Sequence, residues 1–202
     1  MAIVHPKFRA PGVPRCFLGL LAGAGLVAAA SAVASDDFSI GIGAGADRGR
    51  VDCVASFDCD RSGSHAKLFA GYRWNDAVDL QVLYFDAGHF KGGDTTPLGT
   101  EFGGAFRVSG FGLTAGYRWE FAPAWSVTAR AGAASVRTRF DYASDIAGSV
   151  SKTTLQPLAS LGIAYAVTPQ LRVGVDYDVT RFKVHTTRGP LQMLGVAAQF
   201  SF

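Results

Sequence analysis

The sequence has 202 residues, of which 49% are hydrophobic, 12% aromatic and only 17% charged, and it contains 25 glycines. The formal net charge is +3, but Lys7, Arg9 and Arg15 supply all of the excess, and the residues after position 34 hold 16 basic and 16 acidic side chains. A nucleic-acid-binding protein needs a net basic face to neutralise phosphates, so we expect no nucleic-acid partner. The high apolar content argues against intrinsic disorder, and the length allows one domain.

The first segment of the chain reads as a targeting sequence. The three basic residues named above precede an uncharged run at Cys16–Ala30, and Ala32-Val33-Ala34 matches the small-residue pattern of a signal-peptide cleavage site. We therefore predict a signal peptide at residues 1–34 and a mature domain at 35–202. A retained membrane anchor is the alternative, because the 20 residues from Cys16 to Ser35 carry no charge. The dominance of Ala and Gly in this stretch favours the signal peptide.

Beyond residue 35, apolar and small or polar residues alternate with a period of two, which is the pattern of β-strands. The alternation recurs in eight segments, at 38–45, 67–74, 78–85, 110–119, 125–132, 157–165, 171–179 and 194–202. The links at 75–77, 120–124 and 167–170 are short, whereas those near 47–65, 88–105, 137–153 and 180–190 are long and polar. Alternating short and long links predict an up-and-down meander with all short turns at one end.

The first long link contains two cysteines. Cys53 and Cys59 are the only cysteines after the predicted signal peptide, since Cys16 lies within it. In an exported protein an even pair of this kind normally oxidises, so we predict a Cys53–Cys59 disulfide. The spacing fits no four-ligand zinc pattern, and we expect no metal and no cofactor.

The composition of the two faces of the predicted strands indicates which environment each face contacts. One face is continuously apolar, and the other is largely Gly, Ser, Thr and Ala with few charges, too poor in Lys and Glu for the exposed face of a soluble sandwich or lipocalin-like barrel. Trp74, Trp119 and Trp125 all lie beside short turns, as in the aromatic girdle of a membrane barrel. The predicted fold is all-β: an eight-stranded antiparallel up-and-down transmembrane β-barrel.

Three segments of the chain carry recognisable motifs: the hairpin Lys67–Asn75 with its Gly-Tyr-Arg-Trp-Asn sequence, the strand end Tyr84–Gly88, and the terminal Gln199-Phe200-Ser201-Phe202. These segments resemble the OmpA-like family of small outer membrane β-barrels. The resemblance covers the entire mature chain. It implies localisation in the cell outer membrane, contact with outer membrane lipids, and recognition of Phe200 and Phe202 by the outer membrane assembly machinery. The chain stops at the eighth strand, so we expect a stand-alone barrel without a peptidoglycan-binding domain, and a monomer.

Several polar residues are predicted to face the lumen. They are Lys67, Arg73, Asp79, Gln81, Arg118, Arg130, Arg172, Asp176 and Asp178. Lys67, Asp79, Arg130 and Asp176 are the predicted charge network. These charges could line an ion path, but the interior of an eight-stranded barrel is filled by side chains, and we favour opposite charges that pair and close the lumen. Arg130 and Asp176 each follow the first apolar residue of their strand by five positions, which makes them the predicted partners.

The sequence offers little support for catalysis. Small outer membrane barrels that modify lipid A need a base and a nucleophile near the outer leaflet. His65, His89 and His185 are expected in loops or at loop bases, and none lies in a nucleophile motif. We predict that the protein is not an enzyme.

Basic residues in the long links provide the remaining functional signal. They are Arg137, Arg139, Lys152, Arg181, Lys183 and Arg188. These side chains either contact lipopolysaccharide phosphates or are simply solvated. The predicted function is a structural or surface-interaction role through the extracellular loops. A small porin-like channel is the alternative, and a lipid A-modifying enzyme is the less favoured one.

Overall fold

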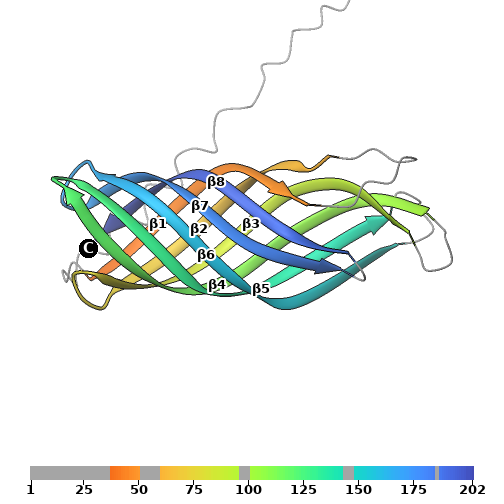
Figure 1. Ribbon diagram of the computed structural model, residues 1–202, viewed down its shortest axis with the longest axis horizontal. Helices are drawn as coiled ribbons and strands as arrows, with labels where there is room; N and C mark the ends of the chain where they lie inside the picture. Colours follow the sequence, from red (N-terminus) through yellow and green to blue (C-terminus); the bar gives the residue numbers. More distant parts are fainter. Residues whose placement is uncertain (1–36, 51–59, 96–100, 143–147, 185–186) are drawn as a thin grey trace, which may run out of the picture. The chain divides into compact units, whose positions relative to one another are not determined.

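The computed structural model describes residues 37–50, 60–95, 101–142, 148–184 and 187–202. The strands are β1 (Phe38–Gly49), β2 (Ser62–Arg73), β3 (Val78–Thr95), β4 (Glu101–Ala122), β5 (Trp125–Tyr142), β6 (Ser149–Ala166), β7 (Leu171–Val184) and β8 (Thr187–Ser201). Each strand pairs antiparallel with its sequence neighbours, and β1 also pairs with β8, which closes the barrel (Figure 1). The predicted eight-stranded up-and-down barrel is confirmed. In the described part of the chain, no helix is long and apolar enough to cross a membrane.

The C-terminal residues complete the ladder. Ile40 of β1 lies opposite Phe200 of β8, and the backbone N–H of Phe202 donates to the carbonyl of Phe38 at 2.9 Å. Because every strand then has two neighbours, no sheet edge is left open in the part of the barrel that contains these C-terminal residues. Closure of this kind is needed in lipid, which offers no partner for an unpaired backbone group.

Three tight turns connect the strands at one end of the barrel, here called the short-turn end; the opposite end is the long-loop end (Figure 1). Between β2 and β3, the Asn75 side chain accepts hydrogen bonds from the backbone N–H groups of Ala77 and Val78, at 2.9 and 2.8 Å. Between β6 and β7, the Thr168 hydroxyl accepts from the N–H of Leu171 at 2.9 Å. Asn and Thr are favoured in turns because their side chains replace a missing backbone partner.

The strands extend further toward the long-loop end than the sequence predicts. The links expected at 88–105, 137–153 and 180–190 are largely strand, since β3 runs to Thr95 and β5 runs to Tyr142. The expectation was wrong because the alternation continues there in reversed chemical form, with charged residues facing out and apolar ones facing in. A bulge between Ala87 and His89 also shifts the phase of β3 by one residue.

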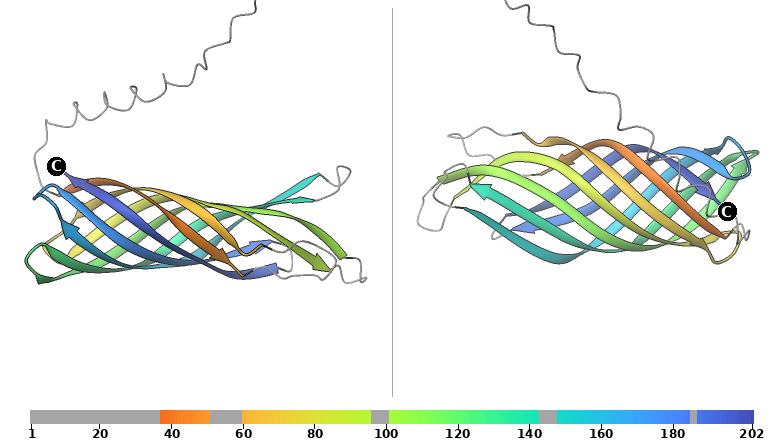
Figure 2. Two further views of the ribbon diagram at one scale, coloured as in Figure 1. Left: turned by 90° about the horizontal axis from the view of Figure 1, so that it is seen from above. Right: turned by 180° about the vertical axis from the view of Figure 1, so that it is seen from behind.

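The ladder between β6 and β7 ends early. Pairing stops at Ala159 opposite Val179, although β6 continues beside β5 up to Ser149. Pro157 has no N–H to donate at this point, and its carbonyl accepts a hydrogen bond from the Thr180 hydroxyl instead, at 2.9 Å. The β5–β6 hairpin leans away from β7 and β8 above this level (Figure 2). We call this interruption the β6–β7 seam.

The outward face forms a continuous apolar band. Its exposed residues include Phe38, Ile40, Ile42, Leu68, Val82, Phe111, Leu113, Leu161, Ile163, Val175, Leu194 and Val196. Trp74, Trp119 and Trp125 are exposed beside the short turns, and the Trp125 ring lies 5.1 Å from that of Tyr165. This arrangement is that of a membrane-spanning surface bounded by an aromatic girdle.

The inward face differs between the two halves of the lumen. From its middle to the long-loop end the lumen holds an apolar cluster, made of Phe69, Leu83, Phe85, Ala87, Phe90, Phe106, Val108, Ala134, Val136, Phe140, Leu158, Phe182, Leu191 and Met193. We expected small and polar residues throughout the interior, and this apolar cluster corrects that expectation for the long-loop half, where Asp47, His65, Thr138 and Thr180 are the buried polar residues beside it. Glycines make room for the large rings: a Cβ on Gly110 would lie 2.7 Å from the Phe85 ring, and one on Gly41 would overlap Phe69.

Candidate functional site

The ion-paired residues in the middle and short-turn half of the lumen form two groups, while Asp47, buried on β1 near the long-loop end, accepts a hydrogen bond from the backbone N–H of Gly88 at 3.0 Å. In the first, the Lys67 ammonium on β2 donates to Asp176 at 3.0 Å and to Asp178 at 2.7 Å, both on β7. The Lys67 side chain crosses the lumen past β1, where a Cβ on Gly43 would come within 3.5 Å of its Cε. On β6, a Cβ on Gly162 would overlap the Asp176 carboxylate. Glycines on the flanking strands therefore leave room for this ion pair.

The second group is centred on Asp79 of β3. Arg130 on β5 donates from Nε and Nη2 to the two carboxylate oxygens of Asp79, at 3.1 and 3.0 Å. Arg118 on β4 donates to the same carboxylate at 3.4 Å. A Cβ on Gly116 would lie 2.6 Å from both Asp79 Oδ1 and Arg130 Cγ, so the group needs glycine at that position. The two-pronged contact fixes the Arg130 guanidinium in one orientation.

The predicted pair between Arg130 and Asp176 is wrong, because each residue has another partner. Asp79 lies opposite Gly116 on β4, and Gly116 lies opposite Arg130 on β5. These three residues therefore form one row across adjacent strands. Counting positions from strand starts misses this row, because strands in a barrel are staggered relative to one another.

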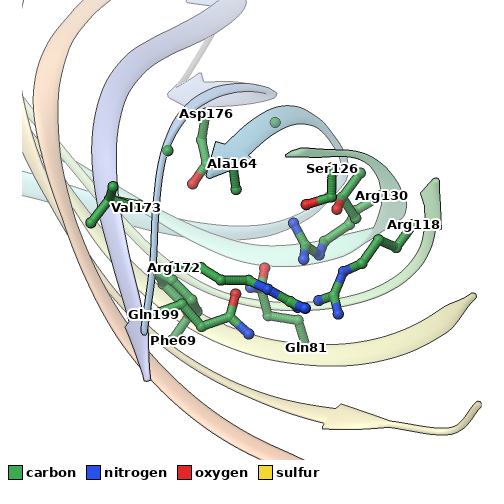
Figure 3. Close-up of a pocket in the computed structure, with 14 residues that line it drawn as sticks. Phe69, Gln81, Arg118, Ser126, Arg130, Ala164, Arg172, Val173, Asp176 and Gln199 are labelled. Atoms are coloured by element: carbon green, nitrogen blue, oxygen red, sulfur yellow. The ribbon is translucent and has the colours of Figure 1, made fainter. Parts of the chain in front are cut away.

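The remaining lumenal residues named from the sequence lie near the short-turn end. Gln81 is buried and Arg73 is half-buried. The Arg172 guanidinium lies 3.6 Å from Glu120, whose side chain is 66% exposed. Arg172 Nη1 is buried, and no hydrogen-bond partner is found for it among the described atoms. Arg118, Arg130 and Arg172 converge in the close-up of this region (Figure 3).

Two small cavities lie in the charged half of the lumen. One cavity of about 30 Å³ is lined by residues that include Arg118, Arg130, Arg172 and Asp176. A second, of about 10 Å³, lies beside Asp79 and Arg73. Volumes of this size hold single water molecules rather than a hydrated solute.

Above the apolar band, the outward surface becomes basic. Its exposed cations are Arg48, Arg50, Arg61, Lys91, Arg107, Arg137, Arg139, Lys152, Arg181, Lys183 and Arg188. We call these residues the basic rim. Two of its cross-strand pairs join like charges, Arg107 opposite Arg139 and Lys183 opposite Arg188. Such pairs are unfavourable unless an anion lies nearby.

The sequence identified only part of the basic rim. The six cations expected in loops all lie on strands, and Arg48, Arg50, Arg61, Lys91 and Arg107 were missed. The outward phase of Arg48, Lys91 and Arg107 in their strands is the signal that could have found these three, whereas Arg50 and Arg61 lie just outside the ends of β1 and β2. Part of the charge is offset by acids, as where Arg139 donates to Asp141 at 2.8 Å.

The histidines are placed differently from the expectation. His65 is buried on β2 and faces the lumen, and His89 lies on β3, facing outward, with Arg107 Nε donating to its Nε2 at 2.9 Å. His185 and the predicted disulfide cysteines, Cys53 and Cys59, lie outside the described residues. Among the residues that are described, no group of three or more His, Cys, Asp or Glu side chains could hold a metal ion.

The C-terminal aromatic residues named from the sequence lie at the short-turn end. Phe200 is exposed on the outward face of β8, and its ring stacks with that of Phe202 at a centroid distance of 6.5 Å. Both rings thus lie next to the closing β1–β8 pair, at the level of the aromatic girdle.

Several solved outer membrane proteins have a similar architecture. Neisserial surface protein A, from Neisseria, superposes with a TM-score of 0.62 at 17% identity, covering 83% of this chain and 98% of that one. Ail of Yersinia pestis gives 0.51 at 18% identity, with 81% and 98% covered, and the N-terminal barrel of Pseudomonas aeruginosa OprF gives 0.50 at 16% identity, with 81% and 97% covered. At such identities the likeness concerns the fold. No curated protein sequence matches the chain.

A match to a protein-family model shows the family to which this chain belongs. The model described as the outer membrane protein beta-barrel domain matches residues 18–202, which include every strand of the closed barrel. The chain therefore belongs to the outer membrane β-barrel family, and it is an outer membrane protein.

Proposed function

We propose that this outer membrane barrel has a surface-interaction role, in which the basic rim binds anionic groups, first of all the phosphates of lipopolysaccharide in the outer leaflet. The observation that carries the proposal is the position of the rim. In this class of barrel the long loops face the cell exterior, so the rim lies just above the outer edge of the apolar band, at the level of lipid head groups.

The change from apolar to basic is abrupt along individual strands. On β7 the outward residues run Tyr177, Val179, Arg181, Lys183, and on β5 Ser135 is followed by Arg137 and Arg139. Each cation near an anionic lipid surface contributes about 1 kcal/mol to binding. A ring of such cations therefore supports contact with phosphorylated lipids.

The β6–β7 seam supports a more specific contact. A groove of about 440 Å³ lies beside it, lined by Gln156, Arg181, Phe182, Lys183, Arg188, Gly189 and Pro190. The groove joins three cations to an apolar wall, which is the combination that an amphiphile with an anionic head group requires. Ail has been solved in complex with sucrose octasulfate, a heparin analogue, so a barrel of this fold is able to bind a polyanion.

The test compares binding of lipopolysaccharide and of its dephosphorylated form to the protein in nanodiscs. Replacing Arg181, Lys183 and Arg188 by Gln should weaken binding of the phosphorylated form at least tenfold, and the loss should shrink as salt is raised. The control variant, with Arg181→Lys and Arg188→Lys, keeps the charge and should retain most of the affinity. Equal binding of both lipids to the unmodified protein would contradict the proposal.

A small channel is the second candidate, since charged residues line the lumen. The paired charges and the apolar cluster support a closed lumen instead, because the cavities found among the charges measure about 30 and 10 Å³ and apolar side chains occupy the lumen toward the long-loop end. Current measurements on the purified protein in planar bilayers distinguish the two: we expect no stable conductance, and steady open-channel currents would make the pore the preferred function.

We also propose that the barrel is a monomer and that the outer membrane assembly machinery recognises its C-terminal end. The closed ladder supports the first point, since no strand edge below the seam remains for a second copy. The aromatic pair of exposed Phe200 and half-buried Phe202 supports the second.

A further inference from the structure

Three guanidinium groups meet at the short-turn end of the lumen. Arg118 comes from β4, Arg130 from β5 and Arg172 from β7, and the ends of Arg118 and Arg172 point toward one another (Figure 3). The side chains of Arg118 and Arg130 are more than nine-tenths buried. Cations so close together in a low-dielectric space repel strongly unless anions lie between them.

The protein itself supplies too little negative charge. Asp79 is held by the two-pronged contact with Arg130, at 3.0 and 3.1 Å, and reaches Arg118 only at 3.4 Å. Asp176, the carboxylate that lines the cavity of about 30 Å³ beside these arginines, is paired with Lys67 at 3.0 Å. Glu120 lies 3.6 Å from Arg172, but it is largely exposed to solvent and so screens weakly.

A count of the paired groups gives the missing charge. The two lumenal ion-paired groups together with Arg172 hold four cations, namely Lys67, Arg118, Arg130 and Arg172. They hold three carboxylates inside the lumen, namely Asp79, Asp176 and Asp178; the fourth acid of these pairs, Glu120, is 66% exposed to solvent and is left out of the count. One monovalent anion would balance them.

The cavity beside these arginines fits such an ion. Its volume is about 30 Å³, and its lining includes the amides of Gln81 and Gln199 and the hydroxyls of Ser126 and Thr128, all groups that can donate hydrogen bonds. Arg172 Nη1 is buried and, among the described atoms, unpartnered. The Arg172 side chain keeps 16% of its exposure, which leaves a way in from the short-turn end.

We propose that the short-turn end of the lumen is a binding site for one small monovalent anion, such as chloride, held by Arg118, Arg130 and Arg172. The ion lies on the side of these arginines away from Asp79 and neutralises the charge that the carboxylates leave over. The site is distinct from the basic rim, which lies at the opposite end of the barrel, so either proposal can fail without the other.

The experiment measures thermal unfolding of the full barrel in nanodiscs while sodium gluconate is exchanged for sodium chloride at constant ionic strength. An ion that binds only the folded state raises the melting temperature as its concentration rises. For the unmodified protein we expect this rise to saturate below about 0.15 M chloride, the physiological ionic strength. Arg172→Gln should remove most of the chloride dependence.

Arg139→Gln is the matched control, because it removes an exposed arginine from the rim and should leave the chloride dependence unchanged. Crystals of the unmodified protein soaked in bromide provide a readout that needs no variant, and anomalous density is expected among the three guanidinium groups. Absence of both the chloride dependence and the bromide density would overturn the proposal. A chloride dependence that persists in Arg172→Gln would overturn the assignment of the site.

Discussion

Asp79 and Arg130 are the residues on which the charged half of the lumen depends most directly. Their side chains are each 9% exposed. Removing Asp79 leaves buried Arg130 without its carboxylate, and removing Arg130 leaves Asp79 with only the longer contact to Arg118, at 3.4 Å; breaking a buried pair typically costs about 3–5 kcal/mol. We expect Asp79→Asn and Arg130→Gln each to lower the unfolding free energy by an amount of that order. The double variant should lose clearly less than the sum, as measured by a double-mutant cycle in lipid or detergent.

The exposed pair Arg139 and Asp141 is the control for that cycle. It has a comparable distance, 2.8 Å, but its side chains are 49% and 41% exposed, and an exposed ion pair contributes about 0.2–1 kcal/mol. Strict additivity at Asp79 and Arg130 would mean that the lumenal pair does not form.

Ala124 holds a conformation that suits glycine better. Its φ is 67°, and it is the only non-glycine residue of the described chain with positive φ. It follows Pro123 in the two-residue turn between Ala122 and Trp125, where a positive φ at the second position favours glycine. The left-handed conformation costs about 1–2 kcal/mol for alanine, and glycine's extra flexibility offsets part of the gain.

We therefore expect Ala124→Gly to raise the unfolding free energy by about 0.5–1 kcal/mol. Ala77→Gly, in the turn between β2 and β3, changes the same atoms without relieving a positive φ and should not stabilise. Chemical denaturation of both variants decides the matter, and equal effects would show that Ala124 is unstrained.

At the scale of the strand, two glycines of β1 lie close to the backbone of β8, where the barrel closes. A Cβ on Gly45 would overlap the carbonyl oxygen of Leu194 on β8, whereas one on Gly43 would lie 3.2 Å from the carbonyl oxygen of Val196. Backbone cannot move aside as a flexible side chain can, so Gly45→Ala should reduce the unfolding free energy by about 1–3 kcal/mol. Gly43→Ala, two residues away on the same face, should have a smaller effect. The opposite order, in unfolding measured by tryptophan fluorescence, would contradict the β1–β8 register.

The β6–β7 seam makes a prediction about backbone protection. Residues 149–158 of β6 pair with β5 on one side only, whereas residues 133–141 of β5, at the same height, pair on both sides. Amides without a ladder partner open more easily. Hydrogen exchange followed by mass spectrometry should show faster uptake in 149–158 than in 133–141, and matching rates would mean that the seam is closed in the membrane.

At the scale of the whole molecule, deletion of the C-terminal residue tests whether Phe202 acts in assembly or in stability. Phe202 contributes one backbone hydrogen bond to Phe38, at 2.9 Å, and one ring contact, which is little in a barrel of this size. If Phe202 is an assembly signal, its deletion should lower the amount inserted in cells severalfold while leaving refolding in detergent nearly intact. The folded fraction is measured by the difference in gel migration between unboiled and boiled samples.

Phe111→Ala removes an exposed aromatic residue from the middle of the apolar band and serves as the control for that deletion. It should not lower insertion selectively. Equal loss in cells and in detergent after deletion of Phe202 would assign the residue to stability instead.

The sequence by itself determined the number of strands, the alternation of short and long connections, and the lipid-facing side of each strand. These follow from local chemistry: period two decides which face a residue such as Phe111 takes, and turn formers such as Asn75 and Pro123 mark where strands end. The position of the tryptophans beside the short turns required no knowledge of the tertiary structure.

Only the tertiary structure decided which lumenal charges meet and where the interior is apolar. Asp79 reaches Arg130 because Gly116 separates them in one row across three strands, and that row depends on the stagger of the barrel, which no single segment encodes. The apolar cluster was not predicted from the sequence, and the basic rim was predicted only in part, for a related reason. Toward the long-loop end the inward residues are apolar and the outward residues face water. The same alternation of apolar and polar residues therefore indicates the opposite faces there, and only the closed barrel shows which residues point inward.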